Sequence, residues 1–144
     1  APGLYNVIAG TCELLIDLRH VEGASLGRLA YAIEARAREI ASHRRIDLTW
    51  ELVSRQNPIS MNSGFVEAAV KLAAERGIAH RRMASGAGHD AMIFAGAGIP
   101  SLMLFVPSRG GISHSPDELT TPRQLAAGIE FARELLPRLA GGPV

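Results

Sequence analysis

The residues best suited to chemistry lie in one polar loop, Ser108 to Pro116, in which His114 stands between Ser113 and Ser115. The loop follows an apolar run, 102–106, and in open α/β sheets ligands collect beyond the carboxyl ends of strands. A histidine there can ligate a metal ion, or it can simply be solvated. Metal sites need at least three or four ligands, and His114 has no partner nearby in sequence, so spacing alone leaves both interpretations open.

A second loop, 85–91, contains Gly86, Gly88 and His89. It fits the dinucleotide pattern G-x-G-x-x-A only superficially, because no apolar strand precedes it and no acidic residue follows about 20 positions later. A better use of the loop is to present backbone N–H groups and His89 at a helix start, where a carboxylate or carbonyl oxygen could be received. The alternative is a structural turn with Asp90 as a polar cap.

Composition limits the function further. The 144 residues are 47% hydrophobic and 20% charged, which predicts one compact domain or two small ones. The formal net charge of +1 provides no strong field for nucleic acid or an anionic membrane. Cys12 is the single cysteine, and the chain has neither a long apolar run nor a signal-peptide pattern at its start, so we expect a cytoplasmic location.

The first part of the chain has the pattern strand, helix, strand. Apolar and polar residues alternate over 11–19 and 46–52, and apolar residues at helical spacing fill 26–41, with Ser25 as the candidate N-cap. Arg19 ends the first predicted strand on the face opposite its apolar side chains. Such a crossover makes two strands parallel, but two strands and one helix are too small to stand alone. This part needs more sheet, from residues outside the chain or from a partner.

A boundary is predicted near Pro58, because the residue before a proline avoids the helical region. Beyond it, Asn62-Ser63 caps a helix over 65–73, and 102–106 has the pattern of a strand buried on both faces. The last helix begins with a capping box at Thr121. Its predicted buried stripe is Leu125, Ala126, Ile129, Ala132 and Leu136. The fold class predicted from these patterns is α/β, with α+β in the first part.

Three segments resemble one family when they are taken together. They are Asn6-Val7-Ile8 with Leu15-Ile16-Asp17-Leu18-Arg19, then Ala84-Ser85-Gly86-Ala87-Gly88-His89-Asp90-Ala91, and then Phe105 to Pro116. In this order they resemble the binuclear-metal amidohydrolases that include N-carbamoyl-L-amino-acid hydrolase, allantoate amidohydrolase and β-ureidopropionase, which are relatives of zinc aminopeptidases. The resemblance covers nearly the whole chain and implies that it is the C-terminal portion of such an enzyme.

The resemblance implies a domain organisation. Residues 1–57 would be half of a ferredoxin-like dimerisation and lid domain, and residues 58–144 would be the C-terminal end of the α/β catalytic domain. It also implies a homodimer that acts on a small carbamoyl or ureido compound bearing a carboxylate, such as allantoate.

The resemblance also assigns roles to residues. His114 matches the last ligand of two zinc or manganese ions, while Asn6 and Arg19 match the pair that holds the substrate carboxylate. An arginine suits that role because its planar fork donates two parallel hydrogen bonds. Gly88 and Ser113 match substrate contacts, to which the second loop adds His89 as a substrate-binding candidate.

One part of the family pattern has no counterpart in this chain. The His-x-Asp ligand pair, the adjacent Glu-Glu and a further histidine of the family are absent, so the general-base glutamate is expected upstream. We therefore predict no catalytic residue here and a chain that is inactive alone. Two alternatives stay open: an assembly module that completes a partner's sheet, and a ferredoxin-like domain that binds a small regulatory ligand.

Overall fold

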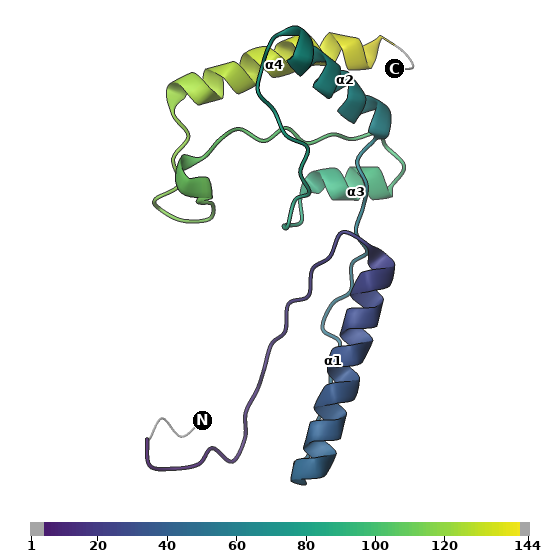
Figure 1. The fold of residues 1–144 in the computed structure, drawn as a ribbon, viewed down its shortest axis with the longest axis vertical. Coiled ribbons are helices and arrows are strands. Elements are labelled where there is room, and N and C mark those ends of the chain that lie inside the picture. The colour runs from purple at the N-terminus through teal and green to yellow at the C-terminus, as the bar shows by residue number, and fades with distance from the viewer. Residues whose placement is uncertain (1–4, 142–144) are drawn as a thin grey trace. The chain divides into compact units, whose positions relative to one another are not determined.

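The computed structural model describes residues 5–141, which form the helices α1 (Gly23–Arg44), α2 (Ser63–Glu75), α3 (Asp90–Gly96) and α4 (Pro122–Ala140) and the short 3₁₀ helix η1 (Arg109–Gly111) (Figure 1). The chain divides into two compact units, Ala1–Pro58 and Ile59–Val144. None of the helices in the described part has the length and apolar character that crossing a membrane requires.

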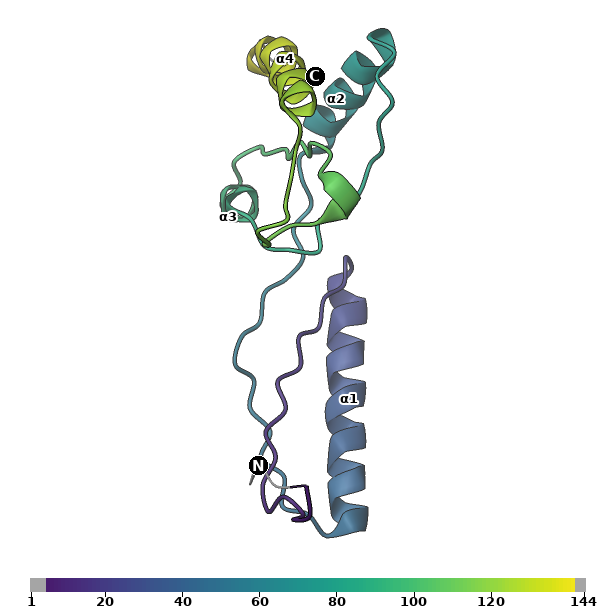
Figure 2. The same cartoon turned by 90° about the vertical axis from the view of Figure 1, so that its left-hand side faces the viewer.

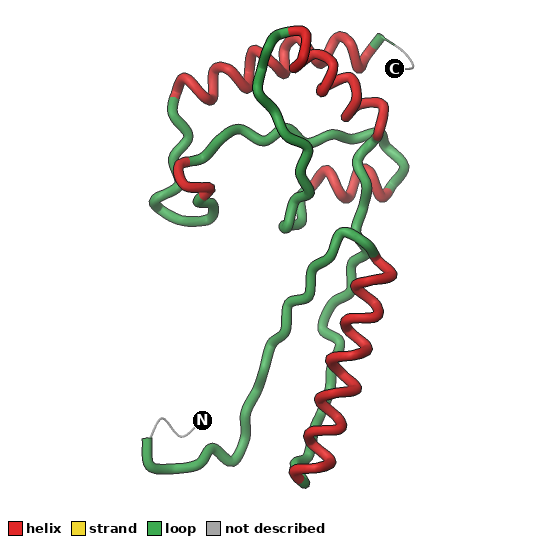
Figure 3. The backbone as a smooth tube through the Cα atoms, in the orientation of Figure 1, coloured by secondary structure: helices red, strands yellow, loops and turns green. Residues whose placement is uncertain are grey.

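The predicted α/β class is wrong for this structure, and so is the α+β character of the first part. Residues 5–141 contain helices and loops but no β-strand (Figure 3). In the first unit, 11–19 and 46–52 are not helical, yet no backbone hydrogen bond joins them within the described range. Alternation favours an extended backbone, whereas a strand also needs a neighbour about 4.8 Å away to form a ladder. Without that ladder the predicted buried face is exposed, as at Leu14 and Ile16.

The strand predicted over 102–106 is wrong for the same reason. Leu104, Phe105 and Val106 are partly exposed rather than buried on two faces. The backbone of this region meets its neighbours at single points, such as the bond from Asn62 N–H to the carbonyl of Ser101, 3.0 Å long. The uninterrupted apolar run over 102–106 therefore predicted buried side chains, whereas three of them are exposed in this structure.

Helix α1 confirms the helix predicted in the first unit. Its N-cap is Glu22 rather than the predicted Ser25, whose hydroxyl donates to the Glu22 carboxylate at 2.9 Å. The C-cap of the helix is Arg45, which takes the left-handed conformation with φ 56° and donates its backbone N–H to carbonyls of the last turn. Within the described residues only Ala41 of this helix is buried, and most of the predicted apolar stripe is half-buried, with Leu29 and Ile40 exposed at 43% and 41%.

Helices α2 and α4 form the core of the second unit, and both predicted caps are confirmed. The Asn62 side chain accepts from the backbone N–H of Phe65 at 2.9 Å, and Thr121 with Gln124 forms the capping box of α4. Leu72 of α2 and Leu135 of α4 are almost fully buried. Residues packed with them are Ala68, Ala69, Leu102, Phe131 and Leu139. This packing orients α4 against α2.

The buried stripe predicted for the last helix is wrong in register. Leu125, Ile129 and Leu136 are 50%, 60% and 64% exposed, whereas the face that contacts α2 includes Leu135. Two ion pairs, Arg76 with Glu134 and Arg138 with Glu75, lie beside this contact at 2.5 and 2.8 Å. Exposed pairs of this kind contribute little to stability, so the register is set by apolar packing.

The segment that leads to the His114 loop passes between helices of the second unit. In two perpendicular views, α2 and α4 lie on one side of the extended segment that follows α3, and α3 lies on the other (Figures 1 and 2). Gly128 of α4 faces this segment closely, because a Cβ added there would lie 2.5 Å from Cγ1 of Val106. Gly128 therefore allows α4 to approach the extended segment that leads to the His114 loop.

Alanine at Gly128 is expected to lower the free energy of unfolding by about 1–3 kcal/mol, the usual cost of overpacking, despite alanine's higher helix propensity. Gly27 of α1 is the matched control, since its added Cβ meets no atom within 4 Å. Gly27→Ala should stabilise by up to about 1 kcal/mol. Urea unfolding followed by circular dichroism measures both, and equal stabilisation by the two substitutions would show that Val106 moves aside freely.

Candidate functional site

The loop that contains His114 is closed by hydrogen bonds between its two ends. The backbone N–H of Arg109 donates to the carbonyl of Leu119 at 2.8 Å, and the Thr120 hydroxyl donates to the carbonyl of Pro107 at 3.1 Å. Inside the loop, the Ser108 hydroxyl donates to the carbonyl of Ile112 at 2.7 Å. The loop is thus a fixed turn rather than an open connection, although it contains few apolar side chains.

His114 is held in an unusual backbone conformation at the exposed part of this loop. Its φ is 55°, in the left-handed region that few residues other than glycine adopt. The Glu118 carboxylate accepts a hydrogen bond from the His114 backbone N–H at 2.9 Å. Such backbone conformations are costly and are concentrated at functional sites. The exposed imidazole and the neighbouring Ser113 side chain are therefore presented by a conformation that the loop enforces.

Alanine at Glu118 is expected to release the His114 backbone. A hydrogen bond to a charged acceptor contributes about 1.5 kcal/mol or more, so amide hydrogen exchange at His114 should accelerate about tenfold. Glu118→Gln is the matched control, because its amide oxygen still accepts and should preserve most of the protection. Exchange measured by NMR decides the matter, and unchanged protection in Glu118→Ala would mean that the loop ends alone fix His114.

The second loop brings Ser85 and His89 into contact. The Ser85 hydroxyl lies 2.9 Å from Nε2 of His89, and the His89 ring meets Phe105 edge-on, with centroids 6.3 Å apart. The helix start predicted here is confirmed as α3, but its N-cap is His89, and Asp90 is its first residue rather than its cap. Gly88 is exposed, with no heavy atom within 4 Å of an added Cβ. The backbone at Gly88 is therefore open to an approaching ligand.

The two loops of the second unit lie on the same side of it. In both views the turn before α3 and the loop around η1 are on the side away from α2 and α4 (Figures 1 and 2). By sequence, Gly88 and His89 belong to the turn before α3, and Ser113 and His114 belong to the loop around η1. Asn6 and Arg19 belong to the first unit.

Arg19 is engaged by a neighbouring carboxylate in the first unit. Its Nε donates to both oxygens of Asp17 at 3.0 Å, and a terminal nitrogen lies 2.5 Å from one of them. The hydrogen bond from Arg19, with a smaller contribution from its charge, lowers the pKa of the Asp17 carboxyl. Both side chains stay well exposed, at 60% for Arg19 and 66% for Asp17. The guanidinium is therefore accessible to solvent, and the Asp17 carboxylate would compete with a substrate carboxylate for it.

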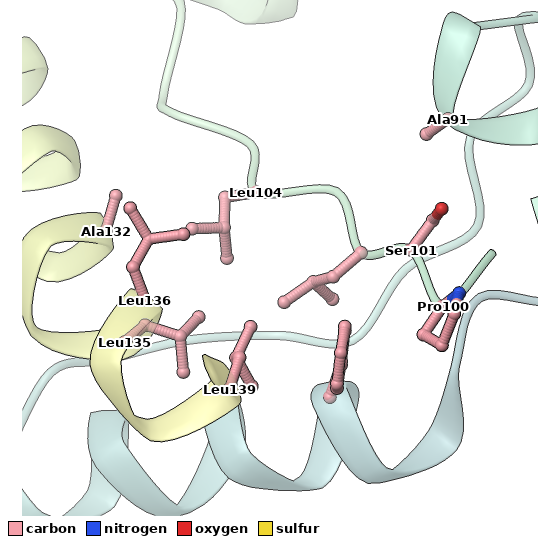
Figure 4. Close-up of a pocket in the computed structure, with 10 residues that line it drawn as sticks. Ala91, Pro100, Ser101, Leu104, Ala132, Leu135, Leu136 and Leu139 are labelled. Carbon is pink, nitrogen blue, oxygen red and sulfur yellow. The ribbon is translucent and has the colours of Figure 1, made fainter. Parts of the chain in front are cut away.

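An apolar cavity of about 350 Å³ lies in the second unit (Figure 4). Its lining includes Leu104 of the extended segment and the leucines of α4 at 135, 136 and 139. Ser101 is the single polar side chain of the lining, and its hydroxyl already donates to the carbonyl of Ile99 at 2.9 Å. The lining has no group that titrates or ligates, so this cavity is not the candidate site.

Three residues that contact the candidate residues were not singled out from the sequence. They are Glu118, which holds His114, Ser85, which contacts His89, and Asp17, which engages Arg19. Sequence spacing carries a signal for each of them. Glu118 and Ser85 each lie four positions from their histidine, and Asp17 lies two positions before Arg19, on the same face of an extended segment.

His114 is the one residue that the sequence predicts as a metal ligand. Across residues 5–141, His, Cys, Asp and Glu side chains form no group of three or more that could hold an ion. One exposed imidazole fits the role of one ligand in a site completed by other residues, because histidine nitrogen is a common ligand of zinc and manganese.

Comparison with known proteins shows which family this sequence matches. Residues 3–138 match the model of peptidase family M20/M25/M40, whose members use metal ions. The allantoate amidohydrolase of Bacillus subtilis is 39% identical over 139 residues, which are 96% of this chain and 34% of that enzyme. The allantoate amidohydrolase of Escherichia coli is 36% identical with the same coverage. The chain thus spans about a third of the length of these relatives.

Solved structures agree with this relationship. The crystal structure of an amidase of the hydantoinase/carbamoylase family from Burkholderia multivorans superposes with a TM-score of 0.79 at 31% identity. The superposition covers 87% of this chain and 30% of the amidase. Since the family model matches most of the sequence, this chain belongs to peptidase family M20/M25/M40, and its relatives include allantoate amidohydrolases.

Proposed function

We propose that this chain is the C-terminal portion of a metal-dependent amidohydrolase that cleaves a non-peptide C–N bond in an N-carbamoyl amino acid or a ureido acid such as allantoate. The observation that carries the proposal is the 39% identity to an allantoate amidohydrolase across nearly the whole chain. The left-handed His114 in a closed loop supports it, because a costly backbone conformation is retained at a candidate ligand.

The proposed roles divide between the two units. His114 would be one ligand of a zinc or manganese site. Such ions supply an activated water and stabilise a developing oxyanion. The Arg19 guanidinium and the Asn6 amide would hold the substrate carboxylate, with two parallel hydrogen bonds from Arg19. Gly88 would donate its backbone N–H to the substrate, and Ser113 and His89 would make further contacts.

The chain by itself is proposed to be inactive, because the other ligands and the general base would come from elsewhere in the enzyme. Residues 1–57 would belong to a dimerisation and lid domain, and residues 58–144 to the catalytic domain. The proposed enzyme is a cytoplasmic homodimer, and its substrate is a small carboxylate rather than a nucleic acid or a membrane.

The proposal is tested with the whole protein that contains this segment. After loading with zinc or manganese, it is expected to release ammonia from allantoate or from an N-carbamoyl amino acid, and the 144-residue chain alone is expected to release none. Mass spectrometry of the isolated chain should find less than one retained metal ion per protomer. The absence of ammonia from every ureido and carbamoyl acid tried, with either metal, would overturn the proposed reaction.

A second candidate is a non-catalytic assembly module, which is favoured by the exposure of apolar side chains on segments that are not helical. Leu14 and Leu15 are 79% and 84% exposed in the first unit. Contiguous exposed apolar side chains of this kind mark interaction surfaces. This candidate predicts an oligomer or a complex in sedimentation, and a well-folded monomer would count against it.

A further inference from the structure

The Ser85 hydroxyl is the centre of a small hydrogen-bonded turn in front of α3. It accepts from the backbone N–H of Ala87 at 3.1 Å and donates to the carbonyl of the same residue at 3.0 Å. Its third contact is Nε2 of His89, at 2.9 Å. Ser85 is partly buried, whereas the His89 ring is exposed. The hydroxyl therefore joins the turn to the imidazole.

Counting protons and lone pairs identifies the one tautomer of His89 that satisfies all three contacts of the Ser85 hydroxyl. A serine hydroxyl has one proton to donate and two lone pairs to accept with. If its proton is directed to the Ala87 carbonyl, both remaining contacts must be donated to it, one from the Ala87 N–H and one from His89. All three contacts are then satisfied when Nε2 of His89 carries the proton. In a neutral imidazole, Nδ1 is in that case the acceptor.

The ring is also fixed in position, so this acceptor has a defined direction. Phe105 packs edge-on against the imidazole with an interplanar angle of 70°. His89 is the N-cap of α3, but its side chain makes no capping hydrogen bond. No hydrogen bond to Nδ1 is found within the described residues, and the side chain is exposed. Nδ1 is thus an open acceptor.

We infer that His89 is a specificity residue that accepts a hydrogen bond from the terminal NH₂ of a carbamoyl or ureido group through Nδ1, and that Ser85 positions it by fixing the Nε2–H tautomer. This inference rests on the proposed function and names the part of the substrate that His89 reads. An acceptor at this point distinguishes a ureido group, which ends in N–H donors, from a formyl or acyl group, which does not. Sites that hydrogen-bond a substrate N–H reject analogues that lack it.

The tautomer is tested on the isolated chain, without any substrate. Long-range ¹H–¹⁵N correlation, recorded at a pH above which the His89 chemical shifts no longer change, should show His89 with its proton on Nε2. Ser85→Ala should give a mixture of tautomers and weaken the ring contact with Phe105, whereas Ser85→Thr, which keeps the hydroxyl, should restore both. Ser101→Ala, which removes another local hydroxyl, is the control and should change neither. A proton on Nδ1 in the unsubstituted chain would overturn the inference.

Substrate recognition is tested in the whole enzyme with two His89 variants. The side-chain oxygen of asparagine lies one bond from Cγ, as Nδ1 does, so His89→Asn keeps an acceptor near the proposed position. The glutamine amide instead reaches towards Ser85, where Nε2 lies. The KM for N-carbamoylglycine should rise about tenfold in His89→Gln and about threefold or less in His89→Asn. The inhibition constant of N-formylglycine, which lacks the terminal NH₂, should change in neither.

The outcomes separate this inference from the proposed function. Equal losses in the two His89 variants, or an equal loss of N-formylglycine binding, would overturn the role of Nδ1 while leaving the hydrolase in place. A whole enzyme that hydrolyses no carbamoyl or ureido acid would overturn the proposed function, and with it the substrate assigned to His89. The tautomer and the positioning role of Ser85 are decided by the spectra alone.

Discussion

Asparagine at His114 is expected to lower kcat/KM of the whole enzyme by more than about 100-fold, with little change in the stability of the fold. Loss of an outer partner of a metal ligand already costs about 10- to 100-fold, and loss of the ligand itself should cost more. Asparagine is the informative substitution because it tolerates a positive φ better than most residues. It keeps the backbone conformation at φ 55° and removes only the imidazole.

The controls separate ligation from loop structure. His114→Ala adds backbone strain to the loss of the imidazole, so it should be slightly less stable than His114→Asn but equally inactive. His43→Ala removes an exposed histidine at the end of α1 and should leave activity unchanged. Steady-state kinetics are paired with metal content by mass spectrometry. Full metal content and full activity in His114→Asn would remove His114 from the metal site.

The caps of α2 and α4 could be predicted from sequence because each depends on a few neighbouring residues. Asn62 reaches the N–H of Phe65, and Thr121 pairs with Gln124 three positions later. Local chemistry of this kind is complete within one turn of helix. The helices were therefore found in the right places, although the buried face of α4 depended on its contact with α2 and was misassigned.

The strands were not predictable in the same way. Alternation at 11–19 and the apolar run at 102–106 report the residue types that a sheet prefers, but a ladder depends on a second segment far away in sequence. Leu14 and Phe105 are exposed, so an apolar residue type did not indicate a buried position in these segments. The backbone conformation of a segment depends mainly on its own residues. The burial of its side chains depends on segments that are distant in sequence.

The candidate site lies between these two cases. The position of His114 after an apolar run flagged it, but its left-handed conformation depends on Glu118 and on the closure of the loop between Arg109 and Leu119. Likewise the sequence placed His89 at a helix start, while its contact with Ser85 follows from the fold of the turn. Residue type and loop position identified candidates, and the partners that orient them required three-dimensional proximity.

Alanine at Arg19 is expected to raise the KM of the whole enzyme for a carboxylate-bearing substrate by about 10- to 100-fold, with a smaller effect on kcat. Hydrogen bonds between charged groups contribute about 1.5–3 kcal/mol, and the guanidinium offers two of them in parallel. Lysine retains the charge but not the planar fork, so Arg19→Lys should recover only part of the affinity. An uncharged amide analogue of the substrate should bind equally to the parent and to Arg19→Ala.

Substitution of Asp17 provides a second test, because KM can either fall or rise when its carboxylate is removed. Its carboxylate occupies the guanidinium through contacts of 2.5–3.0 Å, so a substrate must displace it. The pair is well exposed, so solvent screens it and the attraction that a substrate must overcome is weak. If Asp17 only competes, Asp17→Asn should lower KM by up to about fivefold. This gain should persist across neutral pH, because the hydrogen bond from Arg19 lowers the Asp17 pKa and keeps the carboxylate charged there.

The two Arg19 experiments together distinguish three roles. A raised KM in Arg19→Ala with a lowered KM in Asp17→Asn identifies Arg19 as the carboxylate ligand and Asp17 as its competitor. A raised KM in both identifies Asp17 as the group that orients the guanidinium, since its removal then costs more than the competition it relieves. An unchanged KM in Arg19→Ala removes Arg19 from substrate binding.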